Sequence, residues 1–167
     1  MCNWPPDLLL MEDYDGIWDN YLQAVYDRFC RDVVDNPVYF QNKRVSVRRH
    51  PATNGKGFGF WHCISEGTPT RLENDRVPDS ERCQHIGWIR AIIENHPDSN
   101  IQYWQNRRGR ELNHLLWFRR EYLVVLAERR NRSQGETYFL LKTAYMTTRR
   151  HRVRKLQQEC DQWNDNS

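Results

Sequence analysis

The sequence lacks any long run of apolar residues. Its longest run, Tyr122–Ala127, has the length of a strand, whereas a membrane-spanning helix needs about 18 apolar residues or more. Near the start of the chain, Leu8–Met11 is flanked by acidic residues and has neither the basic lead-in nor the small-residue cleavage site of a signal peptide. The sequence therefore predicts a soluble, cytoplasmic protein that has no membrane partner.

Cysteine motifs are equally sparse. The five cysteines are scattered, no two form a CxxC pair, and no HExxH segment is present. A reducing compartment is therefore a simpler interpretation than a disulfide framework or a cysteine-based zinc site. His62 with Cys63 or Glu66 supplies only part of the three-ligand set that a catalytic zinc requires. We expect neither a metal nor another cofactor.

Aromatic and charged side chains are plentiful by contrast. Aromatic residues make up 13% and charged residues 28% of the 167 positions, which is too many aromatic rings for a disordered chain. The net charge of +3 conceals an asymmetry, because residues 1–35 hold eight acidic side chains and two arginines, whereas the remainder holds 23 basic and 14 acidic residues. The acidic head either folds over the basic body and masks part of it, or it forms a solvated helix face.

Hydrophobic periodicity predicts both helices and strands. Apolar residues recur at every fourth position from Ile17 to Val33 and indicate a helix that ends before Pro37. A second helix is expected from a cap at Asp79 or Ser80 to about Asn95, and a basic helix follows near the end of the chain, at about 148–161. The predicted strands are 38–49, 58–65, either 101–106 or 110–118, 122–129 and 137–146.

These elements predict an α+β fold in one domain. We expect an irregular acidic arm over residues 1–15 and a single domain over residues 16–163. Its architecture would be an N-terminal helix, a small antiparallel sheet of about four strands with helices packed on one face, and a basic C-terminal helix.

One candidate for acid–base chemistry is the segment Phe60–Gly67. His62 and Glu66 share a face whether this segment is a strand or a helix, since they are four residues apart. An imidazole that titrates near neutral pH beside a carboxylate suits proton transfer. The structural alternative is a histidine at the edge of the core that a surface glutamate holds.

A second candidate lies at the end of the strand predicted over 137–146. Lys142, Thr143 and Tyr145 make this strand polar after its apolar first half, and an ammonium group with two hydroxyls suits phosphate binding. The alternative is that Thr143 and Tyr145 are ordinary strand-forming residues.

The third feature is the basic density between Tyr103 and Lys155, where fourteen Lys or Arg residues accompany only four Glu. Aromatic residues are interleaved with these cations. Cations neutralise phosphates, and aromatic rings stack on unpaired bases, so the combination suits single-stranded or looped RNA. The alternative is a solvated basic face with the aromatic rings in the core.

The chain also resembles a known group of nucleases in its layout and short motifs. The segment Arg82-Cys-x-His-Ile-x-Trp-Ile-Arg90 is followed by a Trp-x-x-x-x-Gly-Arg turn (Trp104 to Arg110), a Tyr-Leu-Val-Val-Leu strand, a Leu-Lys-Thr-Ala-Tyr strand (Leu141 to Tyr145) and a basic helix. Over roughly residues 58–160 this layout resembles phage- and plasmid-associated members of the superfamily that includes barnase, EndoU, the tRNA-cutting colicins and RelE-type toxins.

The resemblance implies metal-independent RNA cleavage on the surface of an antiparallel sheet, which leaves a 2′,3′-cyclic phosphate and a 5′-hydroxyl end. It implies that His62 and Glu66 are the acid–base pair and that Thr143 and Tyr145 hold the phosphate or the hydroxyl. An arginine would stabilise the charge of the transition state, with Arg71, Arg90 or Arg110 as candidates. Lys142 would also matter. The remaining substrate-binding cations expected are Arg107 and Arg108.

Three functions follow from these observations. The first is an endoribonuclease of toxin type that acts on cellular RNA in a bacterial cytoplasm and is restrained by a partner such as an antitoxin or immunity protein. The acidic first helix would be an internal shield. The second is a non-catalytic RNA-binding module, which needs the same basic surface without His62. The third is an interaction protein whose acidic helix and basic body bind separate partners.

Overall fold

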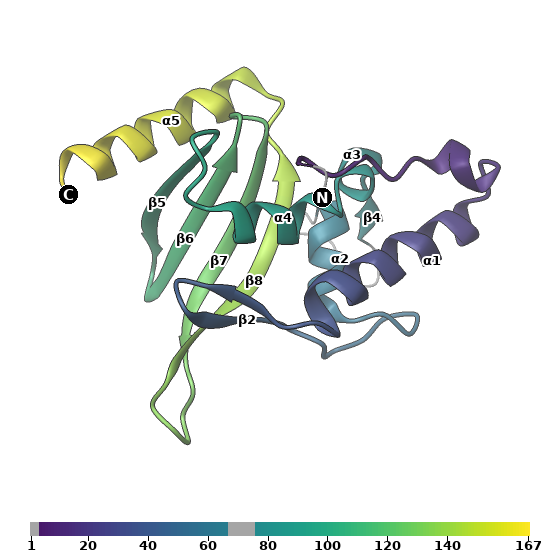
Figure 1. The fold of residues 1–167 in the computed structure, drawn as a ribbon, viewed down its shortest axis with the longest axis horizontal. Coiled ribbons are helices and arrows are strands. Elements are labelled where there is room, and N and C mark those ends of the chain that lie inside the picture. The colour runs from purple at the N-terminus through teal and green to yellow at the C-terminus, as the bar shows by residue number, and fades with distance from the viewer. Residues whose placement is uncertain (1–3, 67–75) are drawn as a thin grey trace.

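The computed structural model describes residues 4–66 and 76–167 and has an α+β architecture, as predicted (Figure 1). In the first of these ranges the chain forms η1 (Met11–Tyr14), α1 (Trp18–Phe29), η2 (Cys30–Val34), β1 (Val38–Phe40), β2 (Lys43–Val47), α2 (Phe58–Ile64) and β3 (Ser65–Glu66). In the second range it forms β4 (Val77–Pro78), α3 (Ser80–Gln84), α4 (Trp88–Asn95), β5 (Ile101–Arg108), β6 (Glu111–Phe118), β7 (Tyr122–Arg130), β8 (Thr137–Met146) and α5 (Arg150–Asp165).

The main sheet is larger than the expected four strands. Six of the described strands form it in the order β1-β2-β8-β7-β6-β5. The sequence predicted a strand at either 101–106 or 110–118, and the structure has a strand at both places. Residues 101–108 and 111–118 pair as an antiparallel hairpin. The hairpin of β1 and β2 adds to the edge of β8 through a parallel pairing of Val45 with Phe139 and Val47 with Leu141. The sheet is therefore mixed.

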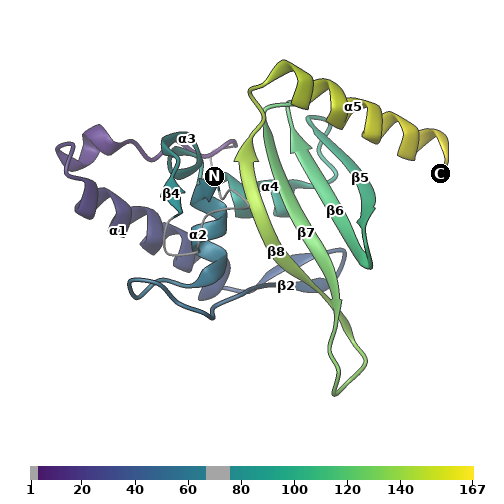
Figure 2. The ribbon, with the colours of Figure 1, turned by 180° about the vertical axis from the view of Figure 1, so that it is seen from behind.

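The helices cover both faces of this sheet, so the prediction of helices on one face was wrong. Alternate side chains of each central strand point to opposite faces, and each face has its own core. The helices α1 to α4 contribute to the larger core, which contains Tyr21, Phe60, Cys83, Ile89, Tyr122, Val124 and Phe139. On the opposite face, α5 packs on a smaller core formed by Trp104, Leu115, Trp117, Leu123, Val125, Leu156 and Cys160. Figure 2 shows α5 across one end of this face, with the other end uncovered.

The segment 58–64 is the helix α2, not the strand that its aromatic composition suggested. Gly59, Phe60, Cys63 and Ile64 are buried, a spacing that follows one side of a helix. Gly59 lies so close to β2 that a Cβ atom there would approach Val47 Cγ1 to 2.5 Å. Packing of this apolar face against β2 and β8 overrides the strand propensity of the aromatic residues. His62 and Glu66 are consequently on different elements, α2 and β3.

An irregularity in β8 interrupts the regular alternation of its side chains. The pairing of β7 with β8 shifts by one residue between Val125 and Leu126, so that Lys142 is an additional residue in β8. Leu141 and Ala144 therefore both belong to the larger core, although they are three residues apart. Tyr145 packs against the smaller core on the other face.

The second predicted helix is divided into α3 and α4. Asp79 caps α3 as expected, because its carboxylate accepts a hydrogen bond from the Arg82 backbone N–H at 3.1 Å.

The segment that precedes α1 packs on the rest of the domain, since Trp88 Nε1 donates to the Pro6 carbonyl at 2.8 Å and the Tyr21 hydroxyl donates to the Leu9 carbonyl at 2.7 Å. The acidic helix α1 packs through Tyr26 on Phe60 of α2 and so contributes to the larger core rather than to the face that bears α5.

Candidate active site

A pocket lies along the C-terminal half of β8 and is lined by the four predicted catalytic residues and by one of the predicted substrate-binding cations. Its volume is about 590 Å³. The pairing of β2 with β8 ends at Leu141, and from there the edge of β8 faces α2 and α3. Five of the residues that the sequence singled out line this pocket, although they come from three separate elements: His62, Glu66, Lys142, Thr143 and Tyr145. We call it the β8 pocket.

His62 is held in place by its ring and by its backbone. The imidazole is half-buried and stacks on the Phe58 ring with 4.0 Å between centroids. The His62 carbonyl accepts a hydrogen bond of 3.0 Å from the Thr143 hydroxyl, which joins α2 to β8. Thr143 therefore positions His62, a role that the sequence analysis did not assign to it.

Arg82 also lines the pocket, although it was not among the predicted site residues. Its guanidinium donates to the carbonyls of Ser65, at 3.1 Å, and His62, at 3.3 Å. It also lies 5.1 Å from the centroid of the Tyr145 ring. The signal for this arginine was present, because Arg82 opens the segment Arg82–Arg90 used for the resemblance. Arg82 is far from His62 and Tyr145 along the chain, so the sequence does not show that the three residues lie together in space.

Two further arginines complete the wall of the pocket. Arg76 donates to the Ser65 hydroxyl at 2.9 Å and to the Ser65 carbonyl at 2.6 Å. Arg152, from α5, donates to the Tyr145 hydroxyl. The contact with Arg152 leaves the Tyr145 hydroxyl hydrogen-bonded to a permanently charged group.

The lining of the pocket has an excess of positive charge. Its five cationic side chains are Arg76, Arg82, Lys142, Arg149 and Arg152. Its three carboxylates are Glu66, Asp79 and Glu81, and its two histidines are His62 and His151. Asp79 is engaged as the cap of α3. Lys142 forms an ion pair with Glu111. Such a pocket suits an anionic ligand that meets imidazole and carboxylate groups.

Cys63 lies next to His62 but faces the core instead of the pocket. It is fully buried, and burial raises the pKa of its thiol to about 12. The thiol is therefore neutral at physiological pH and contributes packing to α2, not a nucleophile.

The other predicted substrate-binding arginines lie elsewhere. Arg90 on α4 donates to the carbonyls of Asp32 and Pro37, at 2.7 and 3.1 Å, and so fastens the connection from η2 to β1. Arg107, Arg108 and Arg110 are exposed at the turn between β5 and β6, which is the far edge of the sheet from β8. Arg71 lies outside the described residues.

The described residues contain neither a candidate metal site nor a helix that could span a membrane. No three His, Cys, Asp or Glu side chains within 4–66 and 76–167 lie together as a metal site would require. In the same ranges, no helix has both the length and the apolar character to cross a membrane. Comparisons of the chain with models of known protein families, with curated proteins and with solved structures found no match.

Proposed function

We propose that this chain is a metal-independent endoribonuclease and that the β8 pocket is its active site. The observation that carries the proposal is that one pocket brings together an imidazole, a carboxylate, a tyrosine hydroxyl and several arginines from α2, β3, α3, β8 and α5. Each of these groups has a place in the transfer of a phosphoryl group from the 5′-oxygen to the neighbouring 2′-oxygen.

The reaction needs one base and one acid. One member of the pair His62 and Glu66 removes the proton of the ribose 2′-hydroxyl, and the oxygen attacks the adjacent phosphorus. The bond from phosphorus to the 5′-oxygen breaks, and the other member donates a proton to the leaving oxygen. The products are a 2′,3′-cyclic phosphate and a 5′-hydroxyl, so atoms and charge balance without a further reactant.

The arginines stabilise the charge that develops on the phosphoryl oxygens. Arg82 is the best-placed cation, because backbone carbonyls of α2 and β3 hold it next to both Thr143 and Tyr145. A guanidinium fixed before the reaction stabilises the transition state without reorganisation. Tyr145, which Arg152 supports, is placed to donate to a phosphoryl oxygen.

Incubation of the purified protein with total bacterial RNA in EDTA tests the proposal. We expect fragments with cyclic-phosphate ends from the wild-type protein. The variants His62→Ala and His62→Gln should lower the cleavage rate by roughly 10²- to 10⁴-fold, with little change in thermal stability since His62 is half-buried. His50→Ala removes an exposed imidazole elsewhere and is the matched control. Intact RNA that still binds the wild-type protein would replace this proposal with a non-catalytic RNA-binding module.

A further inference from the structure

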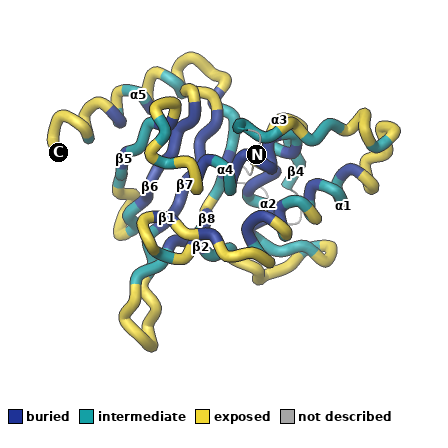
Figure 3. The backbone as a smooth tube through the Cα atoms, in the orientation of Figure 1, coloured by how far each residue is buried: buried dark blue, intermediate teal, exposed yellow. Residues whose placement is uncertain are grey.

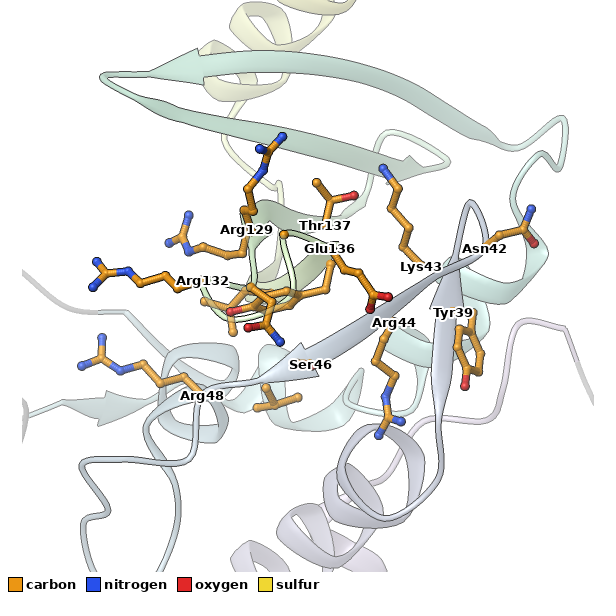
Figure 4. A pocket seen from close by; sticks show the side chains of 16 residues that line it. Tyr39, Asn42, Lys43, Arg44, Ser46, Arg48, Arg129, Arg132, Glu136 and Thr137 are labelled. Atoms are coloured by element: carbon orange, nitrogen blue, oxygen red, sulfur yellow. The ribbon is translucent and has the colours of Figure 1, made fainter.

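A second and larger hollow opens at the other end of β8. It has a volume of about 1410 Å³ and lies between β2 on one side and the hairpin of β7 and β8 on the other (Figure 4). We call it the hairpin groove. Its lining includes Tyr39, Lys43, Arg44, Ser46, Arg48, Arg129, Arg130, Asn131, Arg132, Glu136, Tyr138 and Leu140. Figure 3 shows that the tip of this hairpin is exposed, in contrast to the buried middle of its strands.

The groove is strongly cationic. Six Lys or Arg side chains line it and only one carboxylate, that of Glu136. Arg129 is neutralised by Glu111 at 2.8 Å, but within the described ranges no ion pair engages the other five. Arg44, Arg130 and Arg132 are exposed. In Figure 4 the labelled cations come from both walls, with Arg129 and Arg132 on the hairpin, Lys43 and Arg44 on β2, and Arg48 directly beyond the end of β2.

Aromatic rings accompany these cations. Tyr39 retains 57% of its surface exposed, an unusual state for a large ring on a strand, and Tyr138 is half-buried on the opposite wall. Cations along a concave wall together with accessible rings are the combination that binds single-stranded nucleic acid, because the cations neutralise phosphates and the rings stack on unpaired bases.

One face of β8 contributes residues to both the groove and the β8 pocket. Val45 and Phe139 point into the larger core, so their neighbours Ser46, Tyr138 and Leu140 point to the opposite face. Tyr145 lies on that same face, because it packs on the smaller core. From Tyr138 in the groove to Tyr145 in the pocket, β8 spans roughly 23 Å at about 3.3 Å per residue, which leaves room for a short oligonucleotide.

We propose that the hairpin groove binds the single-stranded RNA that flanks the scissile phosphate, so that one RNA strand runs along β8 from the groove into the pocket. The part of this inference that leads the RNA strand into the β8 pocket rests on the proposed function. An acidic protein is the other polyanion that such a groove would attract. A protein interface, however, has an apolar centre, and apart from Tyr39 the large apolar side chains exposed in the described residues lie outside the groove: Leu8, Met11, Ile17, Trp18 and Val77.

The test uses two probes that separate binding from cleavage. The first is a fluorescent oligouridylate of about 12 nucleotides with 2′-O-methyl groups, which blocks attack by the 2′-oxygen and so reports affinity alone. The second is a set of cleavable dinucleotides, too short to reach from the pocket into the groove. The groove variant is Arg44→Ala, Arg130→Ala, Arg132→Ala. The matched control, Arg31→Ala, Arg154→Ala, Lys155→Ala, removes the same charge from exposed positions outside both sites.

The groove variant should bind the oligouridylate at least tenfold more weakly than the wild-type protein. The slope of log affinity against log salt concentration should become less steep by about 2, because each of the three lost phosphate contacts contributes about 0.7. Dinucleotide cleavage should remain within about twofold of wild type, and the control should bind nearly as well as wild type. If groove variant and wild type bind alike, or if the control loses as much affinity, the inference is wrong.

Two other results distinguish the inference from the proposed function. Loss of oligouridylate binding in the groove variant, together with no cleavage of any substrate by the wild-type protein, would support an RNA-binding groove and overturn the ribonuclease. A wild-type protein that ignores the oligouridylate but binds a polyglutamate peptide through the same three arginines would overturn the RNA groove in favour of an acidic protein partner, such as an antitoxin.

Discussion

Tyr145 has two separable parts, a ring that lies near Arg82 and Arg152 and a hydroxyl that is hydrogen-bonded to Arg152. The ring lies 5.1 Å from the Arg82 guanidinium and packs against the smaller core. The hydroxyl accepts a hydrogen bond from Arg152. The ring is therefore part of the structure, whereas the hydroxyl is the part that the proposed reaction would use.

The variant Tyr145→Phe separates these parts. It keeps the ring and its contact with Arg82 but removes the hydroxyl. We expect the cleavage rate to fall by about 10- to 100-fold, since one donor to the transition state is lost, and the melting temperature to change by only a few degrees. Tyr138→Phe, in the groove, is the control. Equal rates for Tyr145→Phe and wild type would leave Tyr145 with the packing role only.

Short sequence motifs pointed to those lining residues of the β8 pocket that are close together in the chain. His62 and Glu66 are four residues apart, as are Leu141 and Tyr145, so short motifs identified both groups. Arg82 was missed because its partners, His62 and Thr143, are brought to it only by the docking of α2 and α3 on β8. Arg90 has the same residue type in the same segment, but its guanidinium donates to the carbonyls of Asp32 and Pro37, outside the β8 pocket. Composition does not distinguish these two arginines.

Among the secondary-structure elements, α2 shows how closely a helix must approach the sheet to place His62. The Gly59 backbone N–H donates to the Arg48 carbonyl at 2.7 Å, directly beyond the end of β2. A Cβ atom at position 59 would lie 2.5 Å from Val47 Cγ1 and 3.1 Å from the Arg48 carbonyl oxygen. Only glycine allows this contact, and α2 would otherwise stand further from β8.

The variant Gly59→Ala should therefore destabilise the protein by about 1–3 kcal/mol, the range for overpacking in a core. Cleavage should also decrease, because α2 carries His62. Denaturant unfolding gives the first quantity and the RNA assay the second. The double variant Gly59→Ala, Val47→Ala removes the closest clash and should be more stable than the sum of the two single changes implies. Strict additivity would show that Val47 is not what confines α2.

Elements with strong periodicity were predicted well, and those defined by packing were not. The four-residue spacing from Ile17 to Val33 and the apolar strand Tyr122–Ala127 specify their own structure. The segment 58–64 is short and rich in aromatic residues, so its burial pattern alone decides between strand and helix. The parallel pairing of β2 with β8 joins distant parts of the chain, and no local pattern in either strand predicts it.

At the scale of the whole molecule, Glu111 connects three strands of the sheet and Glu159 connects α5 to the sheet. Glu111 on β6 forms ion pairs with Arg129 of β7 and Lys142 of β8. Glu159 on α5 accepts hydrogen bonds from Trp104 Nε1 at 2.9 Å and Asn106 Nδ2 at 2.6 Å. Burial by itself raises the pKa of each carboxyl, but these donors outweigh it and hold both pKa values below the ordinary value of 4.5.

These lowered pKa values predict a loss of stability in acid. The unfolded chain binds protons to both carboxyls at a higher pH than the folded chain does, so the stabilisation is complete above pH 4.5 and is lost as the pH falls through the folded pKa values. Unfolding by urea across this range should show wild type more stable than Glu111→Gln, Glu159→Gln at neutral pH, with the difference shrinking below about pH 4.5. His96, whose pKa burial lowers, affects both proteins alike. A difference that does not vary with pH would contradict the assignment.

The parallel pairing of β2 with β8 also has a consequence for the order in which the protein becomes active. During synthesis β2 leaves the ribosome early, and it waits for a partner strand that begins at Thr137. The hairpins of β5 to β8 are local and close quickly, whereas the joining of residues 45 and 139 closes a long loop and comes late. A nascent chain that has not yet reached β8 therefore has neither the groove nor the pocket, so the proposed nuclease cannot attack RNA before β8 has been synthesised and has paired with β2.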